Sequence, residues 1–230
     1  MKKIFLLVVL ISLSLTSCDR ESNGGVDFIP ENTNFNFDSR LPQSQSFQSD
    51  PEISARIGEM QSITNACGAL MNSMTSSRVT VLSRNSNHSS KNSNLPNQYT
   101  WVYGSYVIVY AYGIVGNNYE FEYTINENGN LFYEATGYQA VDGRSGHWEA
   151  NFSYGGNYNV VYDWSINSAD DIHIESEFTL GNDTLNYEFN LNSDNSGDLT
   201  YSFNQDIIFE MSWNSLGSGS YTLNGVIVNF

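Results

Sequence analysis

Apolar and polar residues alternate along most of the chain from residue 99 to residue 230. The stretch 119–125 reads Tyr-Glu-Phe-Glu-Tyr-Thr-Ile, and the stretch 185–191 reads Leu-Asn-Tyr-Glu-Phe-Asn-Leu. A period of two puts all apolar side chains of a strand on one face and all polar ones on the other. The breaks between these stretches are rich in Asn, Asp and Gly, which favour tight turns. Such short breaks leave no room for crossover helices, so consecutive strands must pair as hairpins.

We therefore expect residues 99–230 to form a mainly β domain, an antiparallel up-and-down meander of about nine or ten strands. Two forms remain open at this point. The meander can close into a barrel, which removes free edges, or it can stay a strongly curved open sheet. Three Ser-Gly pairs, at 145–146, 196–197 and 218–219, precede strands, and we attribute them to repeated use of the same turn residues.

A different period precedes the β region. In residues 51–76, apolar residues recur at steps of three and four, which predicts one amphipathic helix. They are Ile53, Ile57, Met60, Cys67, Met71 and Met74, widened by Ile63 and Leu70. Asp50 suits the N-cap and Pro51 the first turn. We expect this methionine-rich stripe to pack on the protein's own core, as a lid or a layer over the β domain.

The remaining segments have no sustained period. Residues 18–50 are rich in Asn, Ser, Gln and Asp, which predicts a mostly disordered tether. The helix and a short extension occupy residues 51–82. A polar linker over 83–98 then leads to the β domain.

The first residues have the layout of a secretory signal. Lys2 and Lys3 form a positive n-region, and an apolar run begins at Ile4. The run is too short for a transmembrane helix. Residues 15–18, Leu-Thr-Ser-Cys, resemble the lipobox of bacterial lipoproteins at all four positions.

This resemblance implies that residues 1–17 are a lipoprotein signal peptide and that Cys18 becomes a lipidated N-terminus. Several acyl chains together would anchor the protein firmly to a membrane. The implied location is the bacterial cell envelope, at the outer membrane, with the periplasmic or surface face left open. Cys67 would then have no disulfide partner, and its place on the apolar helix stripe predicts a buried residue.

The charge of the chain bears on its partners. The net charge is −16, and between residues 98 and 230 seventeen carboxylates stand against a single cation, Arg144. Such a surface repels nucleic acid and anionic lipid, so the acyl chains would be the whole membrane attachment. Solubility explains this charge most simply. The alternative is binding of a cation or of a cationic partner.

No residue pattern indicates catalysis, a cofactor or a metal. The chain has no nucleophile elbow, zincin motif or phosphate loop. The run 194–198, Asp-Asn-Ser-Gly-Asp, lacks the glycine and the glutamate of a calcium loop, so we interpret it as a hairpin turn. Asp183-Thr184-Leu185 is similar to a bacterial O-glycosylation acceptor site, a three-residue match that also arises by chance.

Aromatic residues are dense on the predicted apolar face of the β domain. Those that could face a ligand are Trp148, Tyr162, Trp164, Tyr187 and Trp213. Rings with a polar tip can line a ligand cavity in a barrel, as the loosely similar lipocalin meander does, or stack on sugars. The alternative is that they fill the core.

We therefore expect a lipid-anchored, non-enzymatic lipoprotein whose β domain binds a small apolar or glycan ligand, or a protein. One alternative is a structural lipoprotein that assembles with an envelope complex. Another is an outer-membrane β-barrel, which the short turns and the lipobox disfavour.

Overall fold

The computed structural model describes residues 39–75, 95, 97–153 and 156–230. The expected signal peptide, Cys18, most of the tether and the stretch between the helix and the β domain lie outside the described residues.

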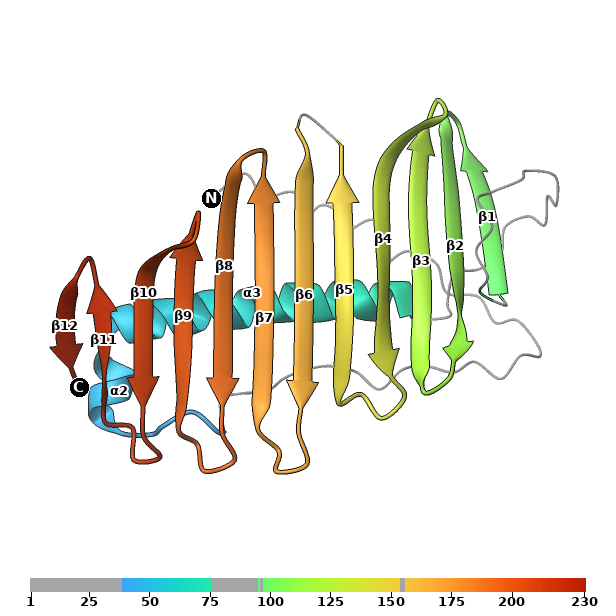
Figure 1. Ribbon diagram of the computed structural model, residues 1–230. Helices are drawn as coiled ribbons and strands as arrows, with labels where there is room; N and C mark the ends of the chain where they lie inside the picture. The colour runs from blue at the N-terminus through green and yellow to red at the C-terminus, as the bar shows by residue number, and fades with distance from the viewer. Residues whose placement is uncertain (1–38, 76–94, 96, 154–155) are drawn as a thin grey trace.

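The β domain is one sheet of twelve antiparallel strands in sequential order (Figure 1). The strands are β1 (Asn97–Tyr103), β2 (Tyr106–Val115), β3 (Asn118–Glu127), β4 (Asn130–Ala140), β5 (Ser145–Phe152), β6 (Tyr158–Ile166), β7 (Ile172–Leu180), β8 (Asp183–Leu191), β9 (Gly197–Phe203), β10 (Asp206–Trp213), β11 (Gly219–Leu223) and β12 (Val226–Asn229). This confirms the predicted meander.

The strand count exceeds the predicted nine or ten because the first and last apolar segments each fold as a hairpin. Gly104-Ser105 separates β1 from β2, and Asn224-Gly225 separates β11 from β12. Asn224 and Gly225 have positive φ angles of 51° and 78°, as the tightest two-residue hairpin turns require.

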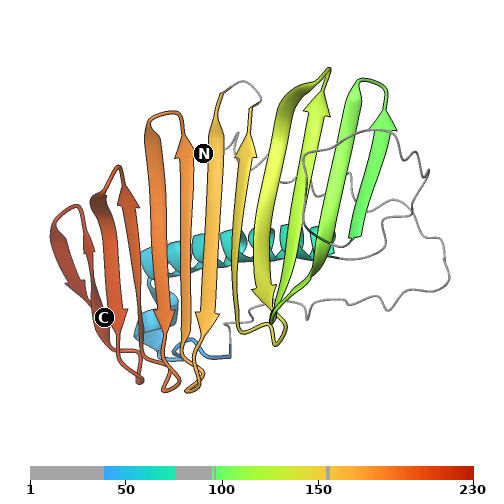
Figure 2. The same ribbon diagram turned by 45° about the vertical axis from the view of Figure 1, so that its right-hand side comes forward.

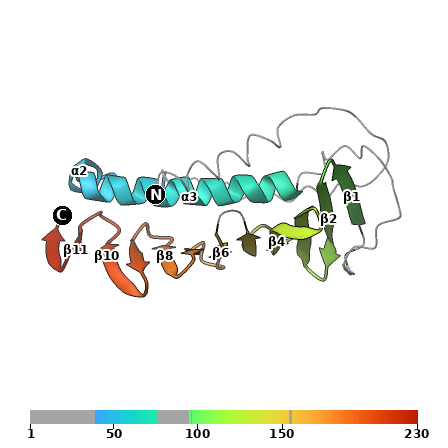
Figure 3. The same cartoon turned by 90° about the horizontal axis from the view of Figure 1, so that it is seen from above.

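The sheet is open, with β1 and β12 at its two edges, so the second of the two expected forms is correct. Within residues 39–75, two helices precede it, α2 (Gln45–Ser49) and α3 (Pro51–Thr75). The axis of α3 runs across the strands on one side of the sheet (Figures 1 and 2). Seen from above in Figure 3, α3 and the sheet form two layers. We call the helix side the inner face and the opposite side the outer face.

The start of α3 is fixed as the sequence predicts. The Asp50 carboxylate accepts hydrogen bonds from the amides of Glu52 (2.9 Å) and Ile53 (3.2 Å), as an N-cap does. Two tyrosines of the sheet then hold the helix in place. The Tyr201 hydroxyl donates to the carbonyl of Arg56 (2.9 Å), and the Tyr221 hydroxyl donates to Asp50 (3.4 Å).

The core lies between α3 and the inner face. The helix contributes Ile53, Ile57, Met60 and Cys67, all buried in one cluster with the sheet's aromatic and aliphatic residues. Arg56 lies at the side of this contact. Its guanidinium stacks over the ring of Tyr201 (5.6 Å) and pairs with Glu52 (2.8 Å). The helix is therefore a packing layer of the domain.

Ordered structure begins before Pro51, within the segment expected to be a tether. Phe47 of α2 is buried and packs edge-on against Trp213 (5.5 Å) and Phe230 (5.8 Å). The Ser44 hydroxyl donates to the carbonyl of Gly217 (3.1 Å). The scattered phenylalanines of this segment thus include one that covers the end of the sheet.

The turns at one end of the sheet repeat a five-residue design. Asn167, Asn192 and Asn214 each open such a turn and are each followed by serine. In every case the backbone N–H of the asparagine donates to the backbone carbonyl of the fifth residue, at 2.8–3.0 Å. The fourth residue has a positive φ in all three turns. These turns set the register of the strands that follow them.

The Ser-Gly pairs have a packing reason that the sequence analysis did not recognise. Each glycine is the first or second residue of a strand, and a Cβ there would collide with an aromatic ring that lies in the next strand or directly after it. The pairs are Gly146 with Trp164, Gly197 with Trp213, and Gly219 with Phe230. Both indole nitrogens also close the neighbouring turn, Trp164 on the carbonyl of Gly143 (3.3 Å) and Trp213 on that of Asn195 (2.9 Å). The three pairs are thus one repeated unit.

Candidate functional site: an uncovered acidic sheet face

The aromatic residues expected to face a ligand all lie in the core between the inner face and α3. Trp148, Tyr162, Trp164, Tyr187 and Trp213 are each at most 4% exposed. The rings of Tyr162 and Trp164 pack at a tilt with their centroids 5.7 Å apart, and burial raises the pKa of the Tyr162 hydroxyl. A ligand would have to displace the helix to reach these rings.

Cys67 is buried in the same core, as predicted, and is a free cysteine within the described part of the chain. Burial raises the pKa of its thiol to about 12, so the thiolate is not formed near neutral pH. The residue acts as a small apolar side chain.

The outer face carries the polar positions of the strands, and the register lines them up across the sheet. One transverse line, which we call the acidic row, has one residue from each strand from β3 to β12. Its members are Glu120, Tyr138, His147, Asp163, Glu175, Glu188, Thr200, Glu210, Thr222 and Ile227. No described element covers this face (Figure 3).

Three carboxylates meet at the middle of the acidic row. Glu175 on β7 lies directly opposite Asp163 on one side and Glu188 on the other. Like charges in directly opposed positions destabilise a sheet by several tenths of a kcal/mol each, roughly. Asp163 is partly compensated by His147, whose Nδ1 lies 2.7 Å from its carboxylate. Glu175 has no basic neighbour in the register, so the face keeps its charge concentrated at this point.

Beside the trio, polar side chains of the outer face form hydrogen bonds across strands. The Asn190 amide donates to Asp198 (2.8 Å) and to Glu188 (3.2 Å), and its oxygen lies 2.7 Å from Nδ1 of His173. These bonds hold neighbouring side chains in fixed positions. The face is therefore an ordered polar surface across adjacent strands.

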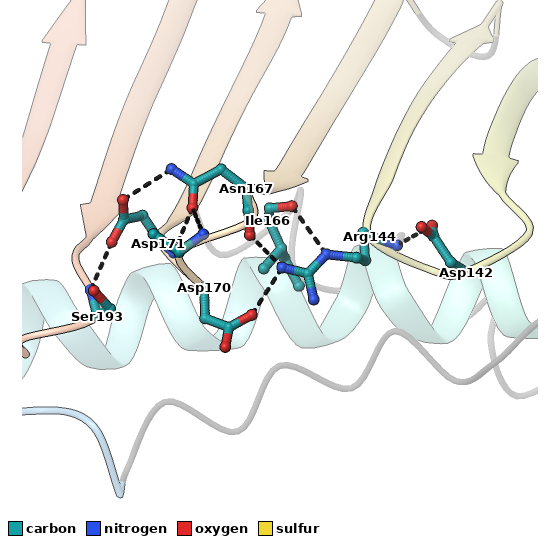
Figure 4. A network of polar contacts seen from close by, with 8 residues as sticks. Asp142, Arg144, Ile166, Asn167, Asp170, Asp171 and Ser193 are labelled. Carbon is teal, nitrogen blue, oxygen red and sulfur yellow. Dashed lines mark hydrogen bonds and ion pairs between the residues drawn. The ribbon is translucent and has the colours of Figure 1, made fainter.

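Arg144, the one cation of the β region, does not neutralise the acidic row. It lies in the turn between β4 and β5, and its guanidinium points to the turn after β6 (Figure 4). It donates to the carbonyls of Ile166 (3.3 Å) and Asn167 and pairs with Asp170 (2.8 Å). The cation joins two turns at the end of the sheet.

Asp171 continues this network toward the next turn (Figure 4). Its carboxylate accepts from the Asn167 amide (2.8 Å) and from the backbone amide of Ser193 (2.7 Å). These hydrogen bonds, the one from Asn167 first, lower the pKa of Asp171 below its ordinary value. The turns at this end are thus linked by structural carboxylates, whereas the carboxylates of the acidic row lie on the outer face of the strands.

The described residues contain no cluster of three or more His, Cys, Asp or Glu side chains arranged to hold a metal ion. The run 194–198 lies in the turn between β8 and β9, where the Asp194 carboxylate accepts from the Ser196 amide (2.9 Å) and hydroxyl (2.6 Å). It is a hairpin turn. Thr184 lies near the start of β8, with its hydroxyl 3.2 Å from that of Thr179.

The alternation of apolar and polar residues places the polar side chains of β7 on one face but does not reveal the trio. The information that predicts the trio is the length of the two turns that flank β7. Across the two-residue turn at 181–182, Glu175 must face Glu188, and the five-residue turn at 167–171 sets it opposite Asp163. Without assigned turn lengths, alternation defines a face and not its neighbours.

Among the described residues, no helix is both long enough and apolar enough to cross a membrane. Comparison with family models, with curated proteins and with solved structures finds no match to this chain.

Proposed function

We propose that the protein is a lipid-anchored, non-enzymatic lipoprotein of the bacterial cell envelope that binds a cationic protein partner on the outer face of its sheet. Cys18 carries the anchor, the following residues form the tether, and the sheet presents the acidic row. The observation that supports this best is the trio of Asp163, Glu175 and Glu188 on a face that no described element covers, where only the two outer members have a histidine nearby, His147 beside Asp163 and His173 beside Glu188.

Electrostatic repulsion within the trio favours a cationic partner. Three adjacent carboxylates weaken the sheet that carries them, and polar substitutes such as the threonines of β9 and β11 occupy the same row elsewhere. Local destabilisation of a sheet by residues on an exposed face is typical of a binding surface. Lysine and arginine side chains of a partner would relieve the repulsion, and they would do so most strongly at low ionic strength.

The anchor is tested by replacing Cys18 with alanine. We expect wild-type protein in the membrane fraction and the Cys18→Ala variant in the soluble fraction, because an acidic β domain has no affinity of its own for anionic lipid. Fractionation and mass spectrometry of the N-terminal peptide give the result. A variant with Cys67 replaced by alanine keeps Cys18 and is the matched control. If the Cys18→Ala variant stayed in the membrane, the proposed anchor would be wrong.

A second candidate uses the inner face for a small apolar or glycan ligand. It is favoured by two buried polar atoms that have no hydrogen-bond partner in the described part of the chain, the Tyr133 hydroxyl and the Trp148 indole nitrogen. A ligand that displaced α3 would reach both. It would also change the fluorescence of Trp148, whereas a partner on the outer face would leave that buried ring unchanged.

A further inference from the structure

A further candidate interaction surface is the edge strand β12, which has a neighbouring strand on one side only. Gly219 of β11 and Phe230 exchange two backbone hydrogen bonds of 3.0 Å. Because the groups of an antiparallel strand alternate in direction, Ile227 and Asn229 direct their amides and carbonyls away from β11. These groups line the free edge of the sheet.

Nothing in the sequence of β12 protects this edge. Exposed edges are usually guarded by charged side chains, proline or a bulge. β12 reads Val-Ile-Val-Asn, and its pairing with β11 has no bulge. Val226 and Ile227 are 62% and 68% exposed. Apolar side chains and free backbone groups thus coincide on one short strand.

β12 also differs from other strands in the residue that it contributes to the acidic row. The alternate strands β6, β8 and β10 carry Asp163, Glu188 and Glu210 at this level of the outer face. At the same level β12 carries Ile227, opposite Thr222. The row therefore carries no charge at β12, an edge strand where charge would help to prevent pairing.

We propose that β12 pairs with β12 of a second copy of this chain, antiparallel and centred on Val228, so that one sheet continues through both molecules. Ile227 then lies opposite Asn229 of the second copy, and four backbone hydrogen bonds form about a two-fold axis. Val228 faces its own counterpart on the inner side of the sheet.

A second copy fits this edge because every side-chain contact in that register is apolar or neutral. Val226 meets Phe230 of the other molecule, and no carboxylate is brought against another. This matters in a chain of net charge −16. The strand has only four residues, so the contact is weak in dilute solution. The proposed lipid anchor would raise the local concentration, but the pairing itself does not depend on the anchor.

Disulfide cross-linking of the purified full-length chain tests the register. In a non-hydrogen-bonded antiparallel pair the two Val228 Cα atoms lie about 4.5 Å apart, within reach of a disulfide. The two Val226 Cα atoms lie roughly 13 Å apart, too far to be bridged. Under mild oxidation we expect Val228→Cys to form covalent dimers several-fold faster than Val226→Cys. Both variants keep the native cysteines, so the wild type gives the background.

A second substitution separates pairing from random collision. Adding Ile227→Lys to the Val228→Cys chain should abolish the excess of dimer, because the two lysines would be diagonal neighbours on the same face of the strand pair and would repel each other. Ile207→Lys is the matched control, since Ile207 is 62% exposed and lies on β10, away from the edge. Equal dimer yields from Val228→Cys and Val226→Cys, or no loss with Ile227→Lys, would overturn the proposal. Neither result would bear on the anchor or on the acidic row.

Discussion

Replacing Met60 with aspartate should destabilise the protein by about 5 kcal/mol or more, enough to unfold most single domains. Met60 is fully buried between α3 and the inner face. The substitution removes a large apolar side chain from the core and places a carboxylate among aromatic rings, where the cation one turn away, Arg56, already pairs with Glu52 and Glu59. Denaturation by urea, followed by tryptophan fluorescence, measures the loss.

The matched control is Asn65→Asp, which adds the same charge to an exposed position of the same helix. We expect its midpoint of unfolding to stay within experimental error of the wild type. Equal stability of the Met60→Asp and Asn65→Asp variants would show that α3 does not pack on the sheet, and the two-layer fold would be incorrect.

The second large effect is expected at Gly197, where alanine should cost about 3 kcal/mol. A Cβ at this position would overlap the carbonyl oxygen of Asn190 and the ring of Trp213. The backbone oxygen cannot move without breaking the pairing of β8 with β9, and the indole is held by its hydrogen bond to Asn195. The expected result is a lower melting temperature with a red-shifted emission from Trp213.

Gly58→Ala makes the same chemical change but should have the opposite effect on stability. Gly58 lies in α3, and nothing is within 4 Å of the position its Cβ would take. Alanine favours the helix over glycine by about 1 kcal/mol, so this variant should be more stable than the wild type. If both alanines stabilised the protein, the aromatic–glycine contacts would not constrain the strands as described.

The sequence predicted those features of the fold that depend on local pattern. Alternation defined the strands, Asn-Gly and related turns defined the hairpins, and Asp50 marked the start of α3. The choice between barrel and open sheet could not be made from pattern, because closure depends on strand tilt and on what covers the apolar face. Here α3 covers that face and β1 and β12 remain edges.

The candidate site was harder to predict for a related reason. The aromatic residues were correctly placed together on one face, but only the packing of α3 shows that Trp148 and Tyr187 are buried. The acidic trio depends on register, which is a property of strand pairs. β12 has the apolar Ile227 where β6, β8 and β10 have carboxylates. This difference is visible only when the strands are compared at the same level of the sheet.

We propose that the outer face binds cations through the trio and not merely through net charge. The direct measurement is the affinity of a ten-residue lysine peptide, by titration calorimetry at low ionic strength, for three purified full-length proteins. These are the wild type, a trio variant (Asp163→Asn, Glu175→Gln, Glu188→Gln) and a turn variant (Asp142→Asn, Asp183→Asn, Asp206→Asn). The turn variant loses the same number of charges at the ends of the strands.

We predict binding to the wild type and to the turn variant with similar affinity, and several-fold weaker binding to the trio variant, because a peptide spanning β6–β8 contacts all three carboxylates at once. The difference should shrink as salt screens the charges. Equal affinity of the trio and turn variants would contradict the claim, since the peptide would then respond only to the total charge of the protein.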